Sequence, residues 1–102
     1  MDQNRLDRVH HISIEVADID AAVNWYLTSF NCEEIRRGAN WSYISFQNII
    51  LCLVLPSLDR RHLAVECVRA DAFGEVTRQY DAVTSTFVSD PTGNIVELVK
   101  IE

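Results

Sequence analysis

The segment HISIEV at residues 11–16 returns as HLAVEC at residues 62–67, and this repeat decides the predicted fold. The two histidines coincide, the two glutamates coincide, and every other pair is small or apolar in both copies. In the first copy, apolar residues alternate as they do in a half-buried strand, which puts His11, Ser13 and Glu15 on one face. The apolar face is expected to pack against a helix, so that His11 lies on the opposite face.

The first half of the chain predicts the order strand, helix, strand, strand, strand. A helix is expected over residues 19–30, where apolar side chains recur with helical spacing and Asp18 or Asp20 can cap the N-terminus. A polar segment over residues 56–61 then connects the two halves. Between the helix and this connector, alternating and aromatic-rich segments predict three strands, over residues 32–37, 41–46 and 49–55.

The second half predicts a similar order in a shorter form. A helix is expected over residues 70–80, where apolar residues recur on one stripe. The sequence SDPTGN at residues 89–94 is typical of a turn, because proline fixes φ and glycine accepts a positive φ. Strands are predicted on either side of it, over residues 82–88 and 95–101. Too few residues remain for another full strand, so one strand of this half is expected to be short or missing.

This internal duplication predicts two similar units that pack by pseudo-symmetry rather than two independent domains. We expect the units at residues 8–55 and 61–102, within a single domain over residues 1–102. A chain of 102 residues is long enough for one hydrophobic core but not for two, which agrees with this division.

Charge and composition exclude several classes of function. With a net charge of −6 and a pI near 4.9, the chain lacks the basic surface that binds nucleic acids or anionic membranes. No apolar run approaches the roughly 18–20 residues of a membrane span, and the N-terminus lacks the apolar region of a signal peptide. The three cysteines show no paired spacing, which favours a reducing compartment. We therefore predict a cytoplasmic protein.

Three segments resemble the vicinal oxygen chelate superfamily, which includes glyoxalase I, bleomycin-resistance proteins and extradiol dioxygenases. They are HISIEVAD at residues 11–18, WYLTSF at residues 25–30 and FVSDPTGNIVEL at residues 87–98. The resemblance implies an α+β fold in which paired βαβββ units form a curved mixed sheet around a cavity, here with the second unit shortened.

The resemblance also implies metal ligands on the first and last strands of each unit. The residues that match are His11, His62 and Glu97. The fourth family position falls on Leu51 when the two halves are aligned, or on Cys52 if the register slips by one residue. Because Leu51 is the residue aligned with Glu97, strand alternation favours Leu51 as the one that faces the metal.

Two imidazoles and one carboxylate suit a divalent transition metal with open coordination positions, here Fe, Mn, Ni or Zn. Such an ion would polarise two adjacent oxygens of a small-molecule substrate as a Lewis acid. The predicted function is therefore a metal-dependent enzyme, dioxygenase-like or a glyoxalase-like lyase or isomerase. The alternatives are a non-catalytic protein that sequesters a small molecule, of the bleomycin-resistance type, and a degenerate ligand- or partner-binding module. The sequence assigns no catalytic residue and shows no motif for a nucleotide cofactor.

Four further residues are candidates for the substrate pocket. Trp41 and Tyr43 share one face of their predicted strand, where they either form an aromatic wall or pack within the sheet. Glu15 and Glu66 share the faces of the two histidines, too far along each strand to be co-ligands. They either line the cavity or bind Arg36, Arg37 or Arg69.

The shortened second unit also predicts an oligomer. It would leave a strand edge or a cavity wall uncovered, and exposed edges are normally paired, covered or charged. Proteins of the resembled superfamily are predominantly dimeric, some with metal ligands shared across the interface. We therefore predict a homodimer, with the site either within one chain or shared between two.

Overall fold

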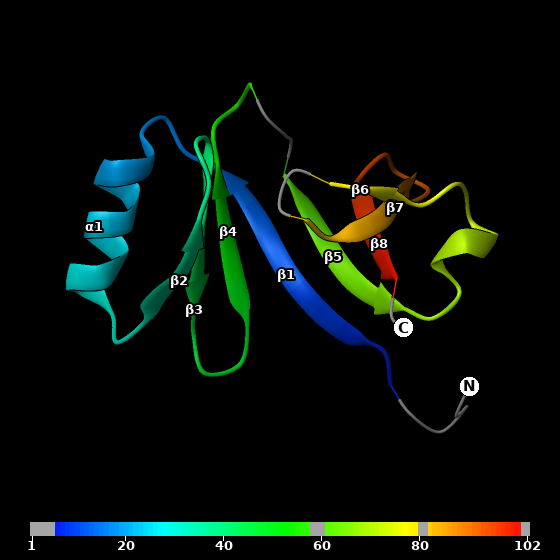
Figure 1. The fold of residues 1–102 in the computed structure, drawn as a ribbon, viewed down its shortest axis with the longest axis horizontal. Coiled ribbons are helices and arrows are strands. Elements are labelled where there is room, and N and C mark those ends of the chain that lie inside the picture. Colours follow the sequence, from blue (N-terminus) through cyan, green and yellow to red (C-terminus); the bar gives the residue numbers. More distant parts are fainter. Residues whose placement is uncertain (1–5, 58–60, 80–81, 101–102) are drawn as a thin grey trace. The chain divides into compact units, whose positions relative to one another are not determined.

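The computed structural model describes residues 6–57, 61–79 and 82–100, and Figure 1 shows its elements. The chain divides into two compact units, which we call the helical unit, residues 11–61, and the C-terminal unit, residues 1–10 with 62–102. Strand β1 (Arg8–Glu15) passes from the C-terminal unit into the helical unit. Three parts of the predicted elements lie outside the described residues: positions 58–60, 80 and 101.

The helical unit confirms the predicted strand, helix, strand, strand, strand order (Figure 1). Its four strands are hydrogen-bonded in the order β2-β3-β4-β1, with β1 parallel to β4 and the other neighbours antiparallel. After β1, the elements are α1 (Ile19–Ser29), β2 (Glu33–Arg37), β3 (Trp41–Ser45) and β4 (Ile50–Val54).

Helix α1 begins where the sequence predicts it and covers one face of this sheet. The carboxylate of Asp18 accepts a hydrogen bond from the backbone N–H of Ala21 at 3.0 Å, which satisfies one of the donors at the helix N-terminus. The apolar stripe of the helix packs on inward-facing side chains of β3 and β4. The buried members of this cluster are Ile19, Val23, Ile44 and Leu53.

The opposite face of the sheet has its own buried cluster. Because side chains alternate along a strand, the residues of β3 and β4 that do not face α1 gather on this second side. They are Trp41, Tyr43, Cys52 and Val54. Strand β1 lies beside β4 with His11 opposite Ile50 and Ser13 opposite Cys52, so the side chain of His11 shares this face.

Among its described residues, the C-terminal unit contains four further strands and one short helical turn. The strands are hydrogen-bonded in the order β5-β8-β7-β6, with β5 parallel to β8 and the other pairs antiparallel. The elements are β5 (His62–Cys67), the 3-10 turn η1 (Ala70–Ala72), β6 (Thr77–Arg78), β7 (Thr84–Ser89) and β8 (Ile95–Lys100). The strand expected to be short is β6.

The prediction of a helix over residues 70–80 is wrong, because within the described part of this segment only η1 is helical. Arg69, at the N-cap position, provides no side-chain hydrogen bond that caps the turn, whereas Asp18 caps α1. The carboxylate of Asp71 accepts a hydrogen bond from Nζ of Lys100 at 2.9 Å instead. Glycine at position 74 and β-branched residues at 76 and 77 also disfavour a helix, and Phe73 is left 57% exposed.

The α+β class and the mixed sheet are confirmed, since each unit combines one parallel strand pair with antiparallel pairs. Among the helices of residues 6–57, 61–79 and 82–100, none has the length and apolar character needed to cross a membrane.

The turn between β7 and β8 is held by one carboxylate. Asp90 accepts hydrogen bonds from the backbone N–H groups of Thr92 and Asn94, both at 2.9 Å, and from their side chains. Gly93 has a φ of +96°, which glycine adopts without strain. These bonds, above all the one from the side-chain amide of Asn94, lower the pKa of Asp90 to about 2.

The turn therefore predicts a loss of stability in acid. Since the pKa of Asp90 is depressed from its ordinary value of 3.8, its contribution is complete above that value and is lost as the pH falls towards 2. We expect Asp90→Ala to lower the urea midpoint at pH 6, and the difference from wild type to shrink between pH 4 and pH 2. A difference that stays constant over this range would contradict the assignment.

Candidate metal centre

Within the C-terminal unit, strand pairing gathers His62, Glu97 and Ser85 on one face. Ala64, two residues beyond His62 on β5, pairs with Glu97 on β8, and Glu97 in turn pairs with Phe87 on β7. Because alternate residues of a strand share a face, His62 and Ser85 point to the same side as Glu97.

Both oxygens of the Glu97 carboxylate have a partner. Oε1 is hydrogen-bonded to Nε2 of His62 at 2.8 Å, and Oε2 accepts a hydrogen bond from Oγ of Ser85 at 2.6 Å. The side chains of His62 and Glu97 are only 1% and 3% exposed. A buried carboxylate is costly unless hydrogen bonds or charges replace its water, and these two contacts do so here. The ring of Phe87 meets that of His62 edge-on at 5.6 Å.

His11 occupies the corresponding position in the helical unit and is completely buried. Its ring lies 5.4 Å from the ring of Tyr43, which in turn lies 5.1 Å from Trp41. The guanidinium of Arg36 stands 5.7 Å over the Trp41 ring, at cation–π distance. Glycine is required at position 38, because a Cβ there would collide with the Trp41 ring.

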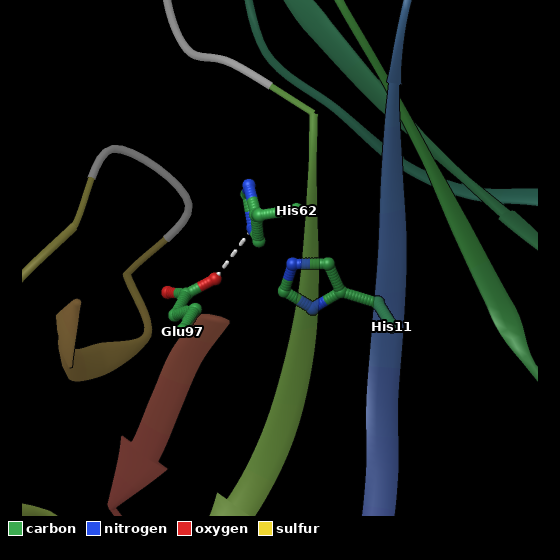
Figure 2. Close-up of side chains that lie close together, drawn as sticks. All are labelled: His11, His62 and Glu97. Atoms are coloured by element: carbon green, nitrogen blue, oxygen red, sulfur yellow. Dashed lines mark hydrogen bonds and ion pairs between the residues drawn. The ribbon is translucent and has the colours of Figure 1, made fainter. Parts of the chain in front are cut away.

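The three predicted ligands form one group of buried side chains (Figure 2). His11, His62 and Glu97 each offer one ligand atom, and these atoms all lie within 4.8 Å of one another. Two atoms bound at right angles to one ion, each about 2.1 Å away, are about 3 Å apart. The 2.8 Å between His62 and Glu97 is close to this value. With its two imidazoles and one carboxylate, the group could therefore hold a divalent transition metal.

Comparison with known proteins rests on structure, since no protein-family model and no curated protein matched the sequence. The fold matches that of a glyoxalase/bleomycin resistance protein/dioxygenase superfamily member from Vibrio splendidus with a TM-score of 0.68. The match covers 94% of this chain and 100% of the other, at 12% identity. The chain has the vicinal oxygen chelate fold.

Two further solved structures are less similar to this chain. The lactoylglutathione lyase of Agrobacterium tumefaciens has a TM-score of 0.46 at 18% identity, over 98% of this chain and 96% of that one. A bleomycin-binding protein complexed with bleomycin has a TM-score of 0.44 at 16% identity, over 95% of this chain and 100% of that one.

On β4, the residue that shares the face of His11 is Cys52, so the prediction that Leu51 faces this side is wrong. Leu51 packs against the cluster beneath α1, whereas Cys52 is buried on the opposite face with Tyr43. Pairing leads to the same assignment. Ser13, two residues beyond His11, pairs with Cys52, just as Ala64, two residues beyond His62, pairs with Glu97. The fold therefore presents a thiol where the other unit presents a carboxylate.

The predicted pocket residues lie in different surroundings. Trp41 and Tyr43 are buried on the face of His11, where they pack with each other in the sheet; a role in substrate binding stays a prediction. Oε2 of Glu66 lies 3.8 Å from Nε of Arg8, which is not one of the three arginines predicted as its partner. Glu15 is half-buried near the end of β1, and neither glutamate belongs to the His-His-Glu group.

Two residues that contact the candidate ligands, Ser85 and Phe87, are not predicted from the sequence as part of the site. Phe87 opens the closing motif of the sequence, and Ser85 lies two residues before it. The signal was available, because residues two apart on the strand next to Glu97 share its face.

Proposed function

We propose that the protein is a metal-dependent enzyme that binds a small substrate through two adjacent oxygens. The observation that carries this proposal is the buried His11, His62 and Glu97 group, whose ligand atoms lie within 4.8 Å. Three protein ligands leave coordination positions open, which is typical of catalytic rather than structural metal sites. Fe, Mn, Ni and Zn all suit this donor set.

The residues around the group supply binding, orientation and exclusion of water. The metal, when bound, supplies Lewis-acid polarisation of the two substrate oxygens. Phe87 against His62, and Tyr43 against His11, place apolar ring surface beside the two imidazoles and keep water from their sides. The hydrogen bonds to Glu97 fix its carboxylate before any ligand arrives. A dioxygenase-like or a glyoxalase-like reaction is compatible with this arrangement.

A chelating probe separates this function from its alternative. Acetohydroxamate, which offers two adjacent oxygens, is expected to bind the Co(II)-loaded protein and to change its visible absorption spectrum. The metal-free protein should not bind it. Equal binding of the probe with and without metal would contradict the proposal. It would favour the bleomycin-resistance type of protein, which sequesters a small molecule without a metal.

We also propose a homodimer. Apolar side chains stay exposed on the strand faces that point away from the histidines, such as Ile12 in the helical unit and Leu63 in the C-terminal unit. Sedimentation equilibrium at micromolar concentration is expected to give twice the chain mass of 11.7 kDa. If the metal site is shared between chains, dilution should release metal and subunits together. A metal-loaded monomer would contradict both the dimer and the shared site.

We propose a cytoplasmic location because the three cysteines are present as thiols. Cys32, Cys52 and Cys67 all lie within the described residues, and no disulfide joins any two of them. This agrees with a reducing compartment, where structural disulfides are rare.

A further inference from the structure

We infer that Ser85 is a positioning residue of this metal centre, which fixes Glu97 so that it presents a single oxygen, Oε1, to the ion. The inference rests on the proposed function. It is carried by the hydrogen bond from Oγ of Ser85 to Oε2 of Glu97 and by the burial of both residues.

The direction of this hydrogen bond follows from the chemistry of the two groups. An ionised carboxylate only accepts hydrogen bonds, so the Ser85 hydroxyl is the donor. The Oγ–Oε2 distance of 2.6 Å lies in the range of hydrogen bonds to charged oxygens. Ser85 is completely buried, so bulk water cannot replace its hydroxyl without a rearrangement of the sheet.

The sheet places this donor on one side of the carboxylate only. Ser85 pairs with Val99 on β8, two residues beyond Glu97, so the contact is a diagonal one between neighbouring strands. Both residues are held by main-chain pairing on elements of the same unit, β7 and β8. A site built on paired strands holds its side chains more precisely than one built on a loop.

Together with His62, this contact removes the rotational freedom of the carboxylate. Oε2 is tied to Ser85, while Oε1 lies 2.8 Å from Nε2 of His62, a nitrogen of a second candidate ligand. Rotation of the carboxylate to bind an ion through both oxygens would cost the bond to Ser85. Glu97 is therefore set to bind through Oε1 alone, which keeps one more coordination position open. Hydrogen bonds of this kind orient ligands in many metal sites, and their loss typically lowers affinity about 10–100-fold.

The helical unit provides a matched control. Ser42 is also completely buried, and its hydroxyl donates to Oε2 of Glu34 at the same distance of 2.6 Å. Ser42 lies on β3 outside the His-His-Glu group. Ser42→Ala therefore removes a serine–carboxylate bond of the same length without touching the proposed ligands.

The experiment compares Ni(II) binding by wild type, Ser85→Ala, Ser85→Thr and Ser42→Ala in a calorimetric titration with the metal alone. We expect Ser85→Ala to weaken Ni(II) binding about 10–100-fold, and Ser85→Thr, which keeps the hydroxyl, to restore most of it. Ser42→Ala should stay within about twofold of wild type. The visible spectrum of the Co(II) form should change in Ser85→Ala only, because the carboxylate is then free to rotate.

Thermal unfolding of the metal-free variants separates structural from positioning effects. One result would overturn the inference: Ser85→Ala binds Ni(II) with wild-type affinity, and Ser85→Ala and Ser42→Ala lower Tm by the same amount. Ser85 would then have only a structural role. Should Ser85→Ala fail to fold, Ser85→Thr with wild-type Ni(II) affinity and Co(II) spectrum supports the inference. A folded Ser85→Thr protein with a changed Ni(II) affinity or Co(II) spectrum counts against the inference. If wild type itself binds no Ni(II), the proposed function fails, and the inference fails with it.

Discussion

Replacement of His62 is expected to weaken Ni(II) binding by at least about 100-fold. A structural zinc site with four ligands gains about 10–16 kcal/mol, so one ligand contributes about 3 kcal/mol, and every 1.4 kcal/mol corresponds to a factor of about ten. His62→Ala also removes the buried hydrogen bond between His62 and Oε1 of Glu97, which destabilises the fold. His62→Gln is therefore the better variant, because its amide can still donate to Oε1 while it is a poor metal ligand.

His11 is the proposed histidine ligand in the helical unit, and its neighbour His10 provides a matched control for its replacement. His10 precedes His11 on β1 and, by strand alternation, points to the opposite face. We expect His11→Ala to lose Ni(II) binding as the His62 variants do, while His10→Ala keeps wild-type affinity. Circular dichroism should show the same strand content in all variants that are compared. Equal losses for His10→Ala and His11→Ala would contradict the assignment of the ligands.

The second large effect concerns the fourth ligand position. Leu51→Glu is expected to destabilise the protein by about 2–4 kcal/mol, because it puts a carboxylate into the cluster beneath α1. Metal should not recover this loss. Cys52→Glu also buries a carboxylate, but on the face of His11, where an ion can neutralise it.

Metal therefore distinguishes the two variants. For Cys52→Glu we expect a lowered Tm without metal, recovery of Tm with Ni(II), and an affinity for Ni(II) raised about tenfold or more by the added ligand. Thermal scans of both variants with and without Ni(II) provide the measurement. If Ni(II) restored the Tm of Leu51→Glu but not that of Cys52→Glu, the two faces of β4 would be the reverse of those described.

Much of the fold was predictable because the chain carries two copies of one pattern. Alternation in the two HxxxE segments predicted β1 and β5, and the helical spacing after Asp18 predicted α1. The same repeat selected His11 and His62, since a histidine that recurs at one strand position is hard to explain by packing alone. Glu97 followed from the closing motif and its place on the last strand.

The register of the fourth position was not predictable from the alignment, because the two turns differ in length by one residue. Ser45 pairs with Ile50 across residues 46–49, whereas Ser89 pairs with Ile95 across residues 90–94. An alignment on the turn asparagines therefore shifts β4 by one residue, and a shift of one residue reverses every side chain. Only the pairing of Ser13 with Cys52 reveals the equivalence with Glu97.

The error over residues 70–80 has a different physical origin. Apolar spacing alone suggested a helix, but spacing says nothing about whether the helix can begin or what its stripe would cover. In the structure the segment has no side-chain cap at Arg69, and the Asp71 carboxylate pairs with Lys100 across the unit. Local sequence could not show this contact between residues 29 positions apart.

The most direct test of the account is the metal content of the purified protein after it is loaded with Ni(II) and dialysed. The account predicts one ion per chain in wild type and in His10→Ala, and none in a His11→Ala/His62→Ala double variant that keeps its circular dichroism spectrum. One ion per chain in that double variant, or none in wild type, would contradict the claim that His11, His62 and Glu97 form a metal centre.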